Sequence, residues 1–168
     1  MDSVPGKPSS KTRHFDSLQQ EAFLNLWRTY DRLHALEEDL FGQFDLTPQQ
    51  YNALRLLRGK GTPTTPAEEL PTLTLASRLV SRAPDITRML DKLESRGLVE
   101  RRRPAGNRRV VLVAITTAGH ELLHELDMRV RECHIRQLGH MALDDLRKLI
   151  DLLHQARRPH EDAESAWR

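Results

Sequence analysis

The chain has 168 residues, of which 38% are hydrophobic and 30% charged, and this length suits one domain with a buried core. Its 26 basic and 24 acidic side chains give a net charge of only +2, which as a whole-chain average argues against a polyanionic partner. The longest apolar run, residues 110–115, is too short to span a bilayer, and the first residues lack the basic and apolar stretches of a secretory signal. A single cysteine, Cys133, excludes an internal disulfide. We therefore expect a soluble, cytoplasmic protein with no membrane partner.

The charge is unevenly distributed along the chain. Residues 1–45 carry a net charge of −3, residues 46–118 carry +7, and residues 119–168 carry −2. A basic centre between two acidic ends is an asymmetry that indicates a nucleic-acid-binding region. The whole-chain average therefore hides a candidate DNA-contacting face in the middle of the sequence.

The N-terminal part is predicted to form a tail and one long helix. Residues 1–14 are rich in Ser, Pro and Lys, and we expect them to be disordered. From Leu18 to Phe44, apolar side chains recur about every 3.7 residues, which is helical periodicity. A helix this long in a small chain favours packing against a second copy, so residues 15–45 are predicted to be a dimerisation helix.

The middle of the chain, residues 46–118, is predicted to hold three helices and a hairpin. Thr47 is suited to cap the first helix, with Pro48 at its first position and Gln50 where a capping box requires it. A Gly-, Pro- and Thr-rich loop follows at residues 59–71. The two short helices after the loop are each apolar on one face, and Gly97 ends the second at the position of a left-handed cap.

The pattern then changes from helical to extended. Residues 98–103 and 110–115 are typical of two strands, joined by a turn at residues 104–107 (PAGN). Residues 119–158 are predicted to form two C-terminal dimerisation helices, and residues 159–168 a flexible tail. The last of these helices is expected to turn four apolar residues inwards: Leu146, Leu149, Ile150 and Leu153.

Two short helices followed by a β-hairpin form a winged helix-turn-helix pattern. The predicted fold class is therefore mainly α with a small β-hairpin wing, together with N- and C-terminal dimerisation helices. The exposed side of the second short helix and its flanks suit a major groove about 12 Å wide. The residues predicted to face the groove are Pro84, Asp85, Thr87, Arg88 and Lys92. Arg88 can donate two hydrogen bonds to a guanine edge, and Asp85 can accept one from cytosine.

The hairpin adds a cluster of positive charge to this helix. Its slim tip, with Asn107, Arg108 and Arg109, suits insertion into a minor groove. Four other arginines are predicted to contact phosphates: Arg78, Arg101, Arg102 and Arg103. The alternative is a solvated hairpin whose arginines pair with acidic side chains elsewhere in the chain.

These residues resemble a known sequence pattern. Thr87-Arg88, residues 93–101 (LESRGLVER) and residues 115–119 (ITTAG) are similar to motifs of the multiple antibiotic resistance regulator (MarR) family of bacterial transcription factors. That family's pattern is a Thr-Arg near the recognition-helix start, then Leu-Glu-x-x-Gly-Leu-Val-x-Arg leading into the wing and Leu-Thr-x-x-Gly after it. The similarity extends more loosely over residues 18–155.

The resemblance implies a homodimer in which helices from both termini intertwine and two winged helices bind a pseudo-palindromic operator in double-stranded DNA. It also implies repression that a small phenolic or anionic effector relieves, and neither catalytic activity nor a cofactor is expected. Three features depart from the family. Asn107 replaces the wing Asp, the loop at residues 59–71 is longer than usual, and Ala142 stands where the last helix commonly has a Ser cap.

A second motif suggests a different function. His120, Glu121 and His124 match H-E-x-x-H, in which two histidines bind zinc and the Glu activates water. A metal-dependent hydrolase is therefore an alternative, although a catalytic zinc needs a third protein ligand, and no metal site is assigned. Two further alternatives are a regulatory metal on these histidines with Cys133 and His134, and oxidant sensing by Cys133. Cys133 lies on an apolar helical stripe, which favours a packing role.

An effector would need apolar walls with a few polar anchors. The residues predicted to supply them are Trp27, Tyr30 and His34 on the first helix, and Tyr51 and Arg55 on the second. Ordinary packing between helices is the alternative for each. The last alternative for the whole chain is a winged-helix module that binds another protein.

Overall fold

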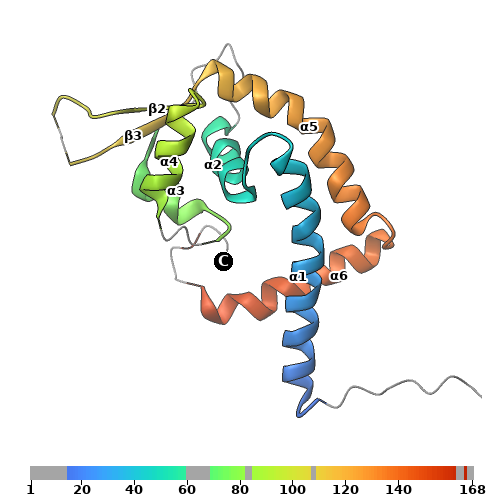
Figure 1. Ribbon diagram of the computed structural model, residues 1–168. Helices are drawn as coiled ribbons and strands as arrows, with labels where there is room; N and C mark the ends of the chain where they lie inside the picture. Colours follow the sequence, from blue (N-terminus) through green and yellow to red (C-terminus); the bar gives the residue numbers. More distant parts are fainter. Residues whose placement is uncertain (1–14, 60–68, 82–84, 107–108, 162–164, 166–168) are drawn as a thin grey trace, which may run out of the picture. The chain divides into compact units, whose positions relative to one another are not determined.

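Figure 1 shows the computed structural model of the chain, which describes residues 15–59, 69–81, 85–106, 109–161 and 165. These residues form helices and one small antiparallel sheet, which confirms the predicted fold class of a mainly α protein with a β-hairpin wing. The chain divides into two compact units, Met1–His34 and Ala35–Arg168, and each is described by itself. None of the helices in the described ranges combines the length and apolar character needed to cross a membrane.

The first helix, α1 (Leu18–Gly42), begins in the first unit and ends in the second. At its start the hydroxyl oxygen of Ser17 accepts a hydrogen bond from the amide of Gln20 at 3.1 Å. The predicted helix is confirmed, but most of its large apolar side chains in the first unit are exposed, and the exposed fraction of Trp27 is 61%. Phe41, in the second unit, is the only fully buried residue of α1.

The helix α2 (Pro48–Arg58) has the predicted start. The amide of Gln50 donates to the Thr47 hydroxyl at 3.2 Å, and the Gln50 side chain accepts from the Thr47 amide at 2.9 Å, which confirms the capping box. The helix ends at Gly59, whose φ of 51° favours glycine. α2 contacts α3, α5 and β3 and so forms the centre of the second unit.

The sheet has three antiparallel strands in the order β1–β3–β2. β2 (Val99–Arg102) and β3 (Leu112–Ile115) form the predicted hairpin, called the wing below, which projects from the helices in Figure 1. β1 (Leu70–Pro71) was not anticipated, because two residues are too few to show an alternating pattern. Just after it, the Thr72 amide donates to the carbonyl of Val111 at 3.0 Å.

Two short helices lie between β1 and β2. α3 (Thr72–Arg78) follows β1 directly, and α4 (Ile86–Ser95) contacts β2. Gly97 follows α4 with a φ of 68°, as expected for a glycine that ends a helix. The helix-turn-helix and the wing are thus in the predicted order.

Two further helices and a short turn complete the second unit: α5 (Thr117–Leu138), α6 (Leu143–Arg157) and η1 (Arg158–His160). α6 follows a cap position, Ala142, that makes no side-chain hydrogen bond. It has no fully buried residue, and Ile150 is 52% exposed. Of the four residues expected to turn inwards, Leu146, Leu149 and Leu153 are half-buried, and the expectation is wrong for Ile150 in the single chain.

The core of the second unit is a continuous apolar cluster that fixes the winged helix on α2 and α5. It draws on every helix from α1 to α5 and on all three strands, and its largest fully buried members are Phe41, Leu54, Leu57, Leu75, Leu90, Leu93, Val99, Val113, Leu123 and Leu126.

Candidate nucleic-acid interface

The helix α4 is strongly amphipathic, as predicted. Met89, Leu90 and Leu93 are buried. Arg88 and Lys92 are exposed, one helical turn apart on the opposite side. The burial of one face fixes the helix and leaves a polar, basic face towards solvent.

The structure gives Asp85 a role that the sequence did not indicate. Its carboxylate accepts a hydrogen bond from the amide of Arg88 at 2.9 Å and so caps the start of α4. The cap uses Oδ1 of Asp85, so the predicted bond from cytosine would have to go to a remaining acceptor site of the carboxylate. Thr87 is exposed in the first turn, whereas Pro84 lies outside the described residues.

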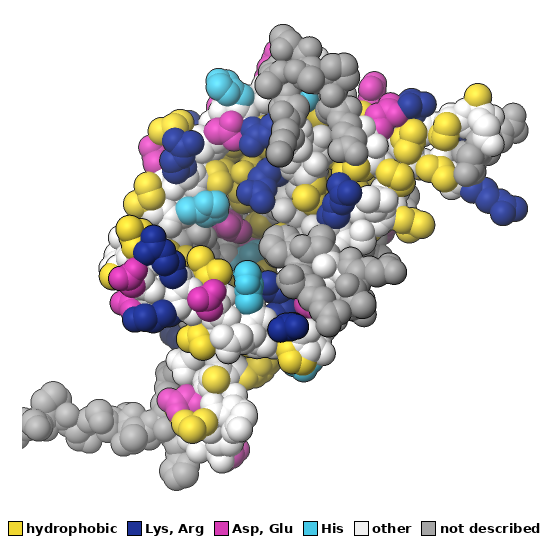
Figure 2. Space-filling view, turned by 180° about the vertical axis from the view of Figure 1, so that it is seen from behind, with side chains coloured by type: hydrophobic (Ala, Val, Ile, Leu, Met, Phe, Trp, Pro, Cys, Tyr) yellow, Lys and Arg dark blue, Asp and Glu magenta, His cyan; other side chains and the backbone are white. Residues whose placement is uncertain are grey.

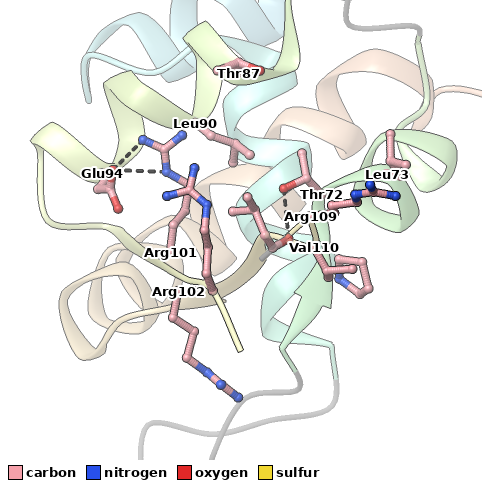
Figure 3. Close-up of a pocket in the computed structure, with 12 residues that line it drawn as sticks. Thr72, Leu73, Thr87, Leu90, Glu94, Arg101, Arg102, Arg109 and Val110 are labelled. Carbon is pink, nitrogen blue, oxygen red and sulfur yellow. Dashed lines mark hydrogen bonds and ion pairs between the residues drawn. The ribbon is translucent and has the colours of Figure 1, made fainter. Parts of the chain in front are cut away.

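Arg101, at the centre of β2, ties the wing to α4. Its guanidinium donates to the Glu94 carboxylate at 3.0 Å from Nε (Figure 3). Its Nη2 also donates to Asp91 at 2.6 Å. The hydrogen bond from Arg101 lowers the pKa of Glu94 below its ordinary value, so this carboxyl stays charged at neutral pH. These bonds fix the wing against α4, and the guanidinium offsets one of the two negative charges beside the basic face.

A second ion pair ties the wing to the segment before β1. Arg102 donates two hydrogen bonds to the carboxylate of Glu69. These bonds lower the pKa of Glu69 and raise that of Arg102. Arg101 and Arg102, both assigned to phosphates from the sequence, thus pair with acids of the same chain, as in the alternative, and their contact with phosphates stays a prediction.

The remaining basic residues of the predicted set present charge to solvent. Arg78, Arg103 and Arg109 are exposed, on α3 and on the two sides of the wing. Asn107 and Arg108, at the predicted wing tip, lie outside the described residues. Seen from behind in Figure 2, basic, acidic and apolar side chains are intermixed over most of the face, and the projecting wing shows both apolar and basic side chains.

Between α3, α4 and the wing lies a hollow of about 550 Å³. Leu73, Leu90 and Val110 give it apolar walls, and the guanidinium groups of the wing lie around it (Figure 3). Its size and mixed lining suit a small ligand.

The five predicted effector residues fall into both units. Trp27, Tyr30 and His34 lie on the part of α1 in the first unit, where the Tyr30 and His34 rings are 5.0 Å apart. Tyr51 and Arg55 lie on α2 in the second unit. Because each unit stands by itself, a pocket that combines them stays a prediction.

Tyr51 is held among packed groups of the second unit. Its ring stacks on Phe41 at a centroid distance of 4.4 Å, and burial raises the pKa of its hydroxyl. On the same helix, Arg58 donates two hydrogen bonds to Asp127 of α5, at 2.8 and 3.0 Å. Tyr51 thus contributes to packing near the joint between α2 and α5.

The H-E-x-x-H motif does not form a metal site. His120 is buried, 5% exposed, whereas Glu121 and His124 are exposed. Within the described part of the chain, no three His, Cys, Asp or Glu residues are grouped so that they could hold a metal ion. The hydrolase alternative is therefore not supported.

Cys133 is buried on α5, as its place on an apolar stripe indicated. Its thiol lies 3.7 Å from the carbonyl oxygen of Leu36, and burial raises its pKa. A thiol that stays protonated is a poor nucleophile, which agrees with packing rather than sensing.

Sequence reasoning missed the acidic partners of the wing. Glu94 lies seven residues before Arg101, on the other side of the turn at Gly97. Because a tight turn brings the end of a helix close to the strand that follows it, the sequence could have suggested this contact. Glu69 is 33 residues from Arg102, and no local pattern connects them.

Comparisons with known proteins agree with this geometry. The sequence profile described as the MarR family matches residues 46–111. The crystal structure of a MarR transcription factor from Planctomyces limnophilus is 56% identical, with a TM-score of 0.64 over 84% of this chain and 99% of that one. A mutant Escherichia coli MarR complexed with operator DNA has the same fold, at 23% identity and a TM-score of 0.70 over 84% of this chain and 99% of that one.

A curated relative is similar over a shorter stretch. The HTH-type transcriptional regulator FarR of Neisseria gonorrhoeae is 32% identical over 93 residues, which is 55% of this chain and 59% of that protein. The chain thus spans little more than half the length of the curated relatives it matches.

Proposed function

Because this chain belongs to the MarR family of transcription factors, we propose that it regulates transcription as a homodimer that binds a pseudo-palindromic operator in double-stranded DNA. The observation that carries the proposal is the basic face of α4, fixed at its base by the core and at its side by Arg101. A recognition helix must hold its side chains in a fixed position to read base edges. α4 and the wing meet this requirement.

The DNA contacts divide by position. Arg88 and Lys92, with Thr87, face the major groove, where Arg88 is suited to a guanine. Arg109 enters the minor groove, and the same contact is predicted for Asn107 and Arg108, which lie outside the described residues. Arg78 and Arg103 contact phosphates, which position the protein without reading sequence.

A second copy of the chain would cover apolar surface that the single chain leaves exposed. Apolar side chains with exposed fractions of 59 to 70% lie on three helices of the predicted dimerisation regions. They are Trp27 and Tyr30 on α1, Ile135 on α5, and Leu143 and Leu152 on α6. Exposed apolar surface of this extent marks an interaction site. Sedimentation equilibrium should give twice the mass of the 19.4 kDa chain, and a monomer at micromolar concentration would refute the homodimer.

The test of DNA binding starts with selection of sequences from random duplexes. Arg88→Ala should reduce the preference for one base pair by about 1–3 kcal/mol, whereas Arg109→Ala should weaken binding to all sequences about equally. Arg131→Ala, which removes one exposed charge from α5, is the matched control and should change neither. Affinity that scarcely responds to salt would favour the protein-interaction module, because phosphate contacts release counterions.

The hollow between α3, α4 and the wing is the proposed effector site. An aromatic carboxylate fits its apolar walls and its arginines. Bound there, the carboxylate would compete with Glu94 for Arg101 and loosen the wing. Titration calorimetry with benzoate and 4-hydroxybenzoate should show binding that Leu73→Ala weakens, because Leu73 lines the hollow and is exposed. No heat with either compound at millimolar concentration would refute an aromatic-acid site.

A further inference from the structure

The turn between α1 and α2, residues 43–46, receives a side chain from the end of α4. We call this turn the α1–α2 corner. The guanidinium of Arg96 donates to two consecutive carbonyl oxygens there, from Nη2 to Phe44 at 3.0 Å and from Nη1 to Asp45 at 2.6 Å. Carbonyls just beyond a helix end lack partners within the helix, and the partial negative charge at that end favours a cation. Asp45 has a φ of 52°, so the corner has a specific, tight conformation.

The backbone of Arg96 is itself fixed. Arg96 is the C-cap of α4, and the amides on either side of the Gly97 turn close the helix end: Gly97 donates to Glu94 at 2.8 Å, and Leu98 to Leu93 at 3.0 Å. Leu98 is buried in the core. The guanidinium therefore extends from a rigid base, and its two hydrogen bonds fix the end of α4 relative to the corner.

The same corner also contacts α5. The guanidinium of Arg129 lies over the Phe44 ring, 5.3 Å from its centroid, which is within the range of a cation–π interaction. Phe44 is half-buried against the apolar core. The α1–α2 corner thus joins the end of α1, the end of the recognition helix and the middle of α5.

We infer that Arg96 is a positioning residue, which sets the orientation of α4 by holding its C-terminal end to the α1–α2 corner. The inference rests on the proposed function, since it concerns the geometry of DNA binding. A ten-residue helix is about 15 Å long, so a shift of about 1 Å at one end tilts it by about 4°. Hydrogen bonds to base edges do not tolerate such shifts well.

The experiment compares Arg96→Gln with Arg96→Lys and Arg103→Gln in the full-length protein, on the selected DNA. Arg96→Gln should weaken binding about tenfold, the equivalent of one charged hydrogen bond, and leave the slope of log affinity against log salt unchanged. Arg96→Lys should recover part of the affinity, because an ammonium can still reach a carbonyl. Arg103→Gln should instead make that slope shallower by about 0.9, because the protein then neutralises one phosphate fewer.

A second readout needs no DNA. In the free protein, hydrogen exchange at the amides of residues 44–46 and 93–98 should be faster in Arg96→Gln than in the wild type or in Arg103→Gln. The midpoint of urea unfolding of Arg96→Gln checks that this variant is folded. A shallower salt slope with unchanged exchange would make Arg96 a phosphate-binding residue and overturn the inference, as would unchanged affinity. If the wild type bound no selected DNA, the proposed function would fail, and the exchange rates would still support or refute the tie between Arg96 and the corner.

Discussion

Gly119, in the first turn of α5, is the position where a single methyl group should do the most damage. A Cβ added there would lie 2.4 Å from the carbonyl oxygen of Leu98 and 2.6 Å from Cγ1 of Ile115. Both neighbours are buried, and the Leu98 carbonyl also accepts the amide of Thr116 at 3.1 Å, so neither can move away easily. Gly119→Ala therefore forces α5 away from the base of the wing.

The magnitude follows from two opposing effects. Overpacking against a fixed backbone costs about 3 kcal/mol. Alanine recovers about 1 kcal/mol, because glycine is the poorer helix former. The net loss is about 2 kcal/mol in the free energy of unfolding, or about 4–8 °C in Tm for a chain of this size.

Urea unfolding followed by circular dichroism, at one fixed protein concentration, measures this loss. Gly42→Ala is the matched control, because a Cβ at Gly42 would meet nothing within 4 Å. The control should be within about 0.5 kcal/mol of the wild type. If Gly119→Ala were as stable as Gly42→Ala, α5 could not approach Leu98 as closely as described.

Three further predictions concern single side chains. The Arg101 ion pair lowers the pKa of Glu94, so the pair stabilises the fold fully above the ordinary carboxyl pKa of about 4.3, and this stabilisation is lost as the pH falls through the lowered pKa. NMR titration of Arg101→Gln should find the Glu94 pKa near its ordinary value. An unchanged Glu94 pKa in this variant would refute the ion pair. Burial raises the pKa of the Cys133 thiol, so iodoacetamide at pH 8 should modify this thiol far more slowly in the folded protein than in urea-unfolded protein. Equal modification rates would show that the thiol is accessible in the folded protein. Thr47→Ala should cost about 1 kcal/mol in urea unfolding, whereas Thr47→Ser should be near wild type; equal losses would contradict the cap.

Local interactions made part of this protein predictable from its sequence. The capping box of Thr47 and Gln50 lies within four residues, and the apolar face of α4 repeats within three turns. A helix start and an amphipathic helix depend on neighbours in the chain, so their patterns are visible without a fold. The winged helix-turn-helix follows from the order of such elements.

The roles of the arginines were not predictable in this way. Six arginines in fourteen residues look alike in the sequence. The structure shows that Arg96, Arg101 and Arg102 bind groups of the same chain, two of them 33 to 52 residues away. A long flexible side chain takes whichever partner the fold brings near, and no local pattern records that partner.

The sequence by itself therefore determined the helices, the hairpin, their order and the basic character of the centre, because these depend on residue type and short spacing. Only the tertiary structure decided which arginines brace the wing and why Gly119 has no side chain. Each of these depends on the approach of segments distant in the chain, such as α5 to the residues that flank the wing. That approach is set by the packing of the whole core rather than by any one motif.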